Sequence, residues 1–152
     1  MVFRDDQYLP VQGLYGSTWR ADPDRAGAGA LLEHSIHDLD ILEWLAGPIT
    51  SLSAQTAHFH GIDGIEDSVS VLARFEGHHT ATLTSVWHDV LSRPSQRRVE
   101  IFCERALLTL EGDVAGPVRR QTGDGEEVLE GAELLDWLAA RDVTVEPAED
   151  VF

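Results

Sequence analysis

Residues 29–48 read GALLEHSIHDLDILEWLAGP, and this stretch decides the fold predicted for the first half of the chain. Its apolar side chains recur every three or four positions, the spacing that gives an α-helix one apolar face. They are Leu32, Ile36, Leu39, Leu42 and Leu45, with Ile41 and Trp44 widening the stripe. Gly47 and Pro48 are typical of a helix end. The pattern predicts a helix over residues 29–46.

Beyond residue 48 the chain alternates between apolar and polar residues in short runs, as half-buried strands do. The predicted strands are 49–60, 68–76, 80–89, 97–104, 106–112, 116–123 and 126–130. Tight turns such as EGHH and GDG join neighbouring runs into hairpins. A short helix is predicted at 131–141. Strands that follow one another without helices between them favour an α+β fold with an open, mostly antiparallel β-sheet and helices packed on one face.

The two ends of the chain are less regular. Residues 1–5 read as a short strand, and residues 6–30 read as a long loop with a short strand near 14–18. Residues 142–152 read as a frayed tail. The 152 residues suffice for one domain with a sizeable core, so we expect a single domain over 1–152.

Charge and composition exclude several functions. The net charge is −16, with 11 basic residues that are all Arg. Phosphate backbones and anionic lipids require basic surfaces, so we expect neither nucleic acid nor a membrane as a partner. Without Lys this chain cannot form a Schiff base or a P-loop. The single Cys103, in the alternating run VEIFCER, is predicted to be buried in a strand. There is no signal-peptide pattern, so we expect a cytoplasmic protein.

The first part of the predicted helix, residues 29–40, carries five titratable side chains. Glu33 and His37 are four residues apart, as are His34 and Asp38, and Asp40 continues the first face. A carboxylate one turn from an imidazole can fix its tautomer for proton transfer. The same spacing is also typical of a solvated helix face with ion pairs, or of part of a metal site. Spacing alone leaves these three interpretations open.

The segments STWR and AGAGALLEHSIHDLDILEWLAGPI resemble the start of the C-terminal domain of the glucose–fructose oxidoreductase and inositol dehydrogenase (Gfo/Idh/MocA) family. The stretch GIEDSVSVLARFEGHHTATLTSVWHD is similar to the strands that follow in that family. The resemblance covers residues 1–110. It implies a fold like the C-terminal domain of glyceraldehyde-3-phosphate dehydrogenase. It also implies the substrate-binding and dimerisation part of an NAD- or NADP-dependent oxidoreductase acting on a sugar or cyclitol hydroxyl.

The resemblance also assigns residues to roles. His37 would exchange a proton with the hydroxyl, and Glu33 would orient His37. His34 would line the same pocket. Trp19 and Arg20 would contact the substrate, a small polyol or sugar, or else pack on the helix start.

The chain departs from the family pattern in two respects. Glu33 stands where the family has Asp, and there is no glycine fingerprint and no Lys. We therefore expect that this chain alone binds no cofactor and transfers no hydride.

Other expectations concern partners and alternatives. We expect self-association into a homodimer or tetramer through the open sheet face. One alternative is a His/Asp metal-dependent hydrolase, because further histidines lie along the strands, but each of them reads as a surface histidine. They are His58, His60, His78, His79 and His88. A second alternative is a catalytically silent oligomerisation module.

Overall fold

The computed structural model describes residues 1–12, 15–90, 92–112 and 116–144. Within it the chain divides into two compact units, Met1–Gln96 and Arg97–Phe152. The expectation of a single domain stays a prediction. The first unit contains the long helix, and the second contains the hairpins of the C-terminal third.

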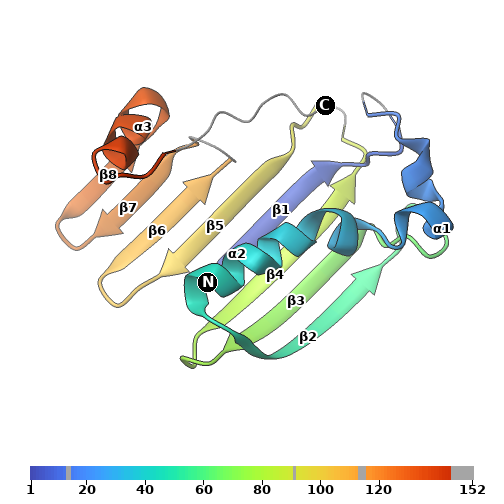
Figure 1. Cartoon of the computed structure of the whole chain (residues 1–152), viewed down its shortest axis with the longest axis horizontal. Coiled ribbons are helices and arrows are strands. Elements are labelled where there is room, and N and C mark those ends of the chain that lie inside the picture. The colour runs from blue at the N-terminus through green and yellow to red at the C-terminus, as the bar shows by residue number, and fades with distance from the viewer. Residues whose placement is uncertain (13–14, 91, 113–115, 145–152) are drawn as a thin grey trace. The chain divides into compact units, whose positions relative to one another are not determined.

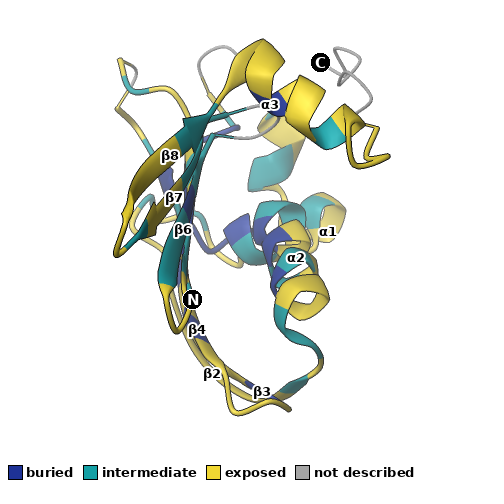
Figure 2. Ribbon diagram, turned by 90° about the vertical axis from the view of Figure 1, so that its left-hand side faces the viewer, coloured by how far each residue is buried: buried dark blue, intermediate teal, exposed yellow. Residues whose placement is uncertain are grey.

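The first unit is a four-stranded sheet with the long helix on one face (Figures 1 and 2). Its strand order is β2-β3-β4-β1. The pairs β2–β3 and β3–β4 are antiparallel, whereas β1 runs parallel to β4. The elements in chain order are β1 (Val2–Tyr8), the 3-10 helix η1 (Thr18–Ala21), α1 (Pro23–Ala26), the π-helical turn η2 (Leu31–Ser35), α2 (Ile36–Ala46), β2 (Ile49–Ala57), β3 (Ser68–Phe75) and β4 (Thr80–His88).

Alternation in β3 and β4 decides which face α2 covers. In β3 the residues Val69, Val71, Ala73 and Phe75 are buried, and the residues between them are not. The same holds in β4, where every second residue from Ala81 to Trp87 is buried. Successive strand residues point to opposite faces, so one apolar row packs beneath the helix. The other row of these strands is mostly Ser and Thr.

The second unit consists of antiparallel hairpins followed by a helix. Its strands pair in the order β5-β6-β7-β8. The elements are β5 (Gln96–Phe102), β6 (Ala106–Glu111), β7 (Val118–Thr122), β8 (Gly125–Leu129) and α3 (Gly131–Ala139). The α+β class, the mostly antiparallel pairing and the predicted strands are confirmed.

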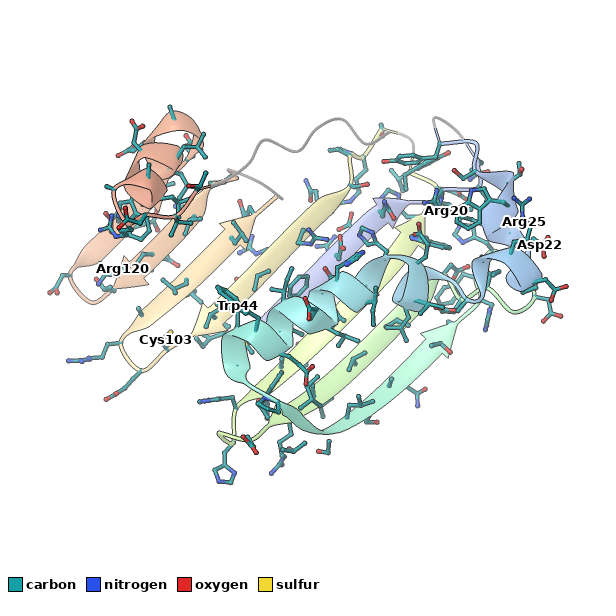
Figure 3. All side chains as sticks on the ribbon, viewed as in Figure 1. Arg20, Asp22, Arg25, Trp44, Cys103 and Arg120 are labelled. Carbon is teal, nitrogen blue, oxygen red and sulfur yellow. The ribbon has the colours of Figure 1, made fainter. Side chains whose placement is uncertain are left out.

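Three local expectations were wrong. The loop predicted over residues 6–30 contains η1 and α1, because Asp22 caps the amide of Asp24 and Pro23 starts a helical turn. The strand expected near 14–18 is absent from its described residues, and Thr18 begins η1 instead. Cys103 is exposed because β5 ends at Phe102, and Cys103 lies in the turn beyond it (Figure 3). Most of the predicted frayed tail lies outside the described residues.

Candidate functional site

The long helix begins on a carboxylate supplied from the loop before β3. The side chain of Glu66 accepts hydrogen bonds from the amides of Gly29 (2.8 Å) and Leu31 (2.9 Å). Its backbone oxygen accepts a third bond, from the amide of Ala30 (2.8 Å). Unpaired amides at a helix start attract negative charge, so this carboxylate both pairs and stabilises them. A Cβ on Gly29 would lie 1.8 Å from the Glu66 carbonyl oxygen, so only glycine fits there.

The first turn of this helix is π-helical, from Leu31 to Ser35, and contains Glu33. The Glu33 carboxylate lies 2.5 Å from the guanidinium of Arg20, and both side chains are 18% exposed. The same guanidinium lies 4.8 Å from the ring centre of Trp19 and donates to the hydroxyl of Ser17. Figure 3 shows Arg20 beside the helix start. Thus three predicted site residues, Trp19, Arg20 and Glu33, come together.

His37 does not join this cluster. Its side chain is exposed on the first turn of α2, and the Glu33 carboxylate is paired with Arg20 instead. The reason is the π-helical turn, which takes more residues per turn than an α-helix. Residues four apart across it therefore do not stack as they do in a regular α-helix.

His34 binds a residue that sequence reasoning missed. Its Nε2 atom lies 2.5 Å from the carboxylate of Asp5 in β1, which is only 3% exposed. Asp38 and Ser35, on the same side of the helix, are completely buried. The buried side of the helix therefore carries polar groups as well as apolar ones. One sequence signal could have identified Asp5. Adjacent residues of a strand point to opposite faces, so one of the neighbouring acids Asp5 and Asp6 must point toward the helix.

Asp6 lies on the opposite face of β1 and is 5% exposed. Arg93 binds its carboxylate through two nitrogens, at 2.7 and 3.0 Å, and Arg4 binds it at 2.8 Å. Burial raises the pKa of Asp6, but the hydrogen bond from Arg93 and the charges of Arg4, Arg93 and His88 outweigh it, leaving that pKa below its usual value. These side chains line a cavity of about 250 Å³.

Asp67, next to the helix-capping Glu66, organises the loop that follows β2. Its carboxylate accepts from the amides of Phe59 (2.9 Å) and His60 (2.6 Å) and lies 2.8 Å from the His60 Nδ1. The other ring nitrogen of His60 lies 3.0 Å from Asp89. Burial raises the pKa of Asp67, but these hydrogen bonds outweigh it and lower that pKa overall.

The other histidines divide into two groups. His58, His78 and His79 are exposed, as predicted. His60 and His88 are only partly exposed, at 20% and 14% of their side chains, and lie against carboxylates. Long-range pairing with Asp67 and Asp6 covers part of each ring, which local sequence could not show. In the described ranges, no group of three or more His, Cys, Asp or Glu side chains is placed to hold a metal ion, so the hydrolase alternative gains no support.

A family model described as the GFO/IDH/MocA C-terminal domain matches residues 2–109, which include the helix, its capping loop and the four strands of the first unit. The chain belongs to this family. The resemblance inferred from the helix motif and the strands after it is therefore confirmed.

Solved structures agree with this assignment at the level of the fold. Levoglucosan dehydrogenase in complex with NADH and L-sorbose superposes with a TM-score of 0.74, at 16% identity over 100% of this chain and 44% of that one. An inositol dehydrogenase homolog with NAD+ from Azotobacter vinelandii gives 0.70, at 20% identity over 85% and 36%. A putative oxidoreductase from Thermotoga maritima gives 0.69, at 15% over 93% and 44%. The chain spans less than half the length of each.

The helix start of this domain does not fit a dinucleotide. A nicotinamide cofactor places its pyrophosphate on free amides at a glycine-rich helix start. Here the amides of Gly29 and Leu31 are already bound by the Glu66 carboxylate, whose negative charge would repel a phosphate. No helix of the described residues is long and apolar enough to cross a membrane.

Proposed function

We propose that this chain is the substrate-binding and self-associating part of an NAD- or NADP-dependent oxidoreductase that acts on a hydroxyl group of a sugar or cyclitol. The observation that carries the proposal is membership of the GFO/IDH/MocA C-terminal domain family, together with an exposed His37 at the family's motif position. The chain's own residues provide no dinucleotide site at the helix start, so hydride transfer by this chain alone is not part of the proposal. A cytoplasmic location stays a prediction.

His37 is the proposed proton-exchanging residue. Its exposed ring is accessible to a substrate hydroxyl, and an imidazole nitrogen can donate or accept a proton, as a general acid or base does. In this proposal Glu33 holds Arg20 in place and does not orient His37 by direct contact. The ion pair between Arg20 and Glu33 connects the η1 segment to the first turn of the helix. Glu33 is therefore a positioning residue in this proposal.

The proposed substrate contacts come from the same end of the helix. Trp19 is 37% exposed beside Arg20, and a flat aromatic face suits the apolar side of a sugar ring. His34 can contribute only through the ring atoms that Asp5 does not bind. Similar solved structures hold levoglucosan or L-sorbose together with NADH, which supports a sugar or polyol as the substrate class.

Self-association through the open face of the sheet is also proposed. That face of β3 and β4 bears mainly Ser and Thr, with Leu72 as an exposed apolar side chain (55%). A surface of mainly small polar side chains with an exposed Leu can pack against a copy of itself. A catalytically silent oligomerisation module would share this surface but not the substrate contacts.

A binding experiment on the purified chain tests the proposal. With myo-inositol and levoglucosan at millimolar concentration, we expect the NMR signals of the His37 ring and the Trp19 indole to shift. Those of His78, an exposed turn residue, should stay in place. Titration with NADH should give no saturable binding. Shifts that are equal at His37 and His78, or absent at His37, would contradict the substrate assignment. Micromolar binding of NADH would contradict the proposal that this chain alone binds no nicotinamide cofactor.

A further inference from the structure

The strand β2 is the outermost strand of the first unit, and its free edge is the subject of this inference. β2 ends the strand order, and its one neighbour within the unit is β3 (Figure 1). All residues from Thr50 to Thr56 are exposed, on both faces of the strand. A strand in this position presents a row of backbone amides and carbonyls with no strand to pair with.

The composition of β2 leaves this edge unprotected. Its sequence, ITSLSAQTA, contains no charged residue and no Pro, in a chain of net charge −16. Protein edges are usually blunted by Lys, Pro, short length or a bulge. The only register shift in β2 lies at its start, between Ile49 and Ser51, so Ser51–Ala57 remain in unbroken register with β3.

The last strand of the second unit provides a contrast. β8, which pairs with β7, has the sequence GEEVL. Its Glu126 and Glu127 pair with Arg119 and Arg120 of β7. Charged side chains on a strand discourage a second copy from pairing with it. β8 has this protection and β2 does not.

We propose that β2 is a self-association site, at which it pairs antiparallel with β2 of a second copy. A two-fold axis through the middle of the strand makes two identical strands antiparallel, so one surface serves both copies. The side chains that would face each other along the strand are Thr, Ser, Leu52, Ala and Gln, without like charges at the 4.5–5.5 Å separation of paired residues. This inference does not depend on the proposed function, and its surface is distinct from the open sheet face.

The pairing should be weak and reversible. One pair of edge strands buries less than the roughly 1,200 Å² of a stable interface. The backbone hydrogen bonds give direction, while Leu52 is the one large apolar side chain between Thr50 and Thr56, so the pairing buries little apolar area. We therefore expect a monomer–dimer equilibrium in the micromolar range that sedimentation velocity can follow.

Two double variants with the same added charge separate edge pairing from packing of the open sheet face. Ala54 and Thr56 pair with the buried row of β3 and are themselves exposed, so Ala54→Lys with Thr56→Lys charges the edge strand on the helix side. Ser70→Lys with Leu72→Lys charges the open face of β3. The edge-paired association is read from the protection of the β2 amides against hydrogen exchange, which packing of the open face does not provide. Edge pairing predicts at least a tenfold rise in its dissociation constant for the first variant and less than twofold for the second.

Protection of the β2 amides that the β3 variant removes and the β2 variant keeps would overturn the proposal. So would a wild-type chain that stays monomeric at roughly 100 micromolar, well above the micromolar dissociation constant expected for edge pairing. If a variant misfolds, a hydrogen-exchange measurement on the wild type still tests the proposal. Hydrogen exchange of the β2 amides should slow as protein concentration rises, while exchange in β8 should not change. Concentration-independent exchange in β2 would also overturn it.

Discussion

Removing the carboxylate of Glu66 should strongly destabilise the first unit. Glu66 is 7% exposed, and its two oxygens accept the amides of Gly29 and Leu31. In Glu66→Ala these buried amides lose their acceptors. The Ala side chain also brings no negative charge to the helix start.

The expected loss in the free energy of unfolding follows from the two hydrogen bonds that Glu66 accepts. A hydrogen bond to a charged group contributes about 1.5–3 kcal/mol, and capping residues typically contribute about 1 kcal/mol. For two such bonds in a buried setting, we expect Glu66→Ala to lower the free energy of unfolding by about 3 kcal/mol. Glu66→Gln keeps one carbonyl acceptor of the same shape, so its loss should be about half as large.

Urea unfolding followed by tryptophan fluorescence measures this change, because the buried Trp87 packs in one cluster with Ala30 and Ile65, the neighbours of the bond partners. Glu76→Ala is the matched control: it removes the same charge from an exposed turn, and we expect a change within about 0.5 kcal/mol. If Glu66→Ala cost no more than Glu76→Ala, the capping role would be refuted.

Three further predictions follow. Gly29→Ala should cost about 3 kcal/mol in urea unfolding, because its Cβ would lie 1.8 Å from a carbonyl oxygen, whereas Gly123→Ala, with open space around it, should cost less than about 0.5 kcal/mol. The pKa of Asp6 is lowered in the folded state, where the Arg93 hydrogen bond and nearby charges outweigh burial. Its stabilisation is therefore present above its usual pKa of 3.8 and is lost as pH falls through the lower folded value. Thermal melting should show Asp6→Asn less stable than wild type at pH 7, with the gap closing in acid. The exposed thiol of Cys103 should react with a thiol reagent in native buffer as fast as in urea, and protection in native buffer would contradict its exposed position.

Much of the fold was predictable because the deciding signals are local. Gly47 ends α2 with a positive φ of 82°, a conformation that glycine adopts without strain. The alternation from Val69 to Phe75 identifies both the strand and its buried face. Elements set by such short-range patterns agree with the sequence to within a few residues.

The site was less predictable because its geometry depends on distant partners. Regular α-helical spacing predicted a contact between Glu33 and His37. In the structure Glu33 lies in a π-helical turn and forms an ion pair with Arg20. The burial of Asp5 depends on His34, which lies 29 positions further along the chain. No local pattern encodes such contacts, so spacing could name candidate residues but not their partners.

The capping of the long helix by Glu66 also has a kinetic consequence. The first turn depends on a side chain 37 positions further along the chain, beyond β2. A helix start with this requirement cannot be completed while that loop is far away, and contacts of large sequence separation form slowly. We expect the β2–β3 hairpin to form first and the helix to gain its π-helical turn late. In refolding experiments, Glu66→Ala should then speed unfolding while leaving the folding rate nearly unchanged, the behaviour of a contact absent from the transition state.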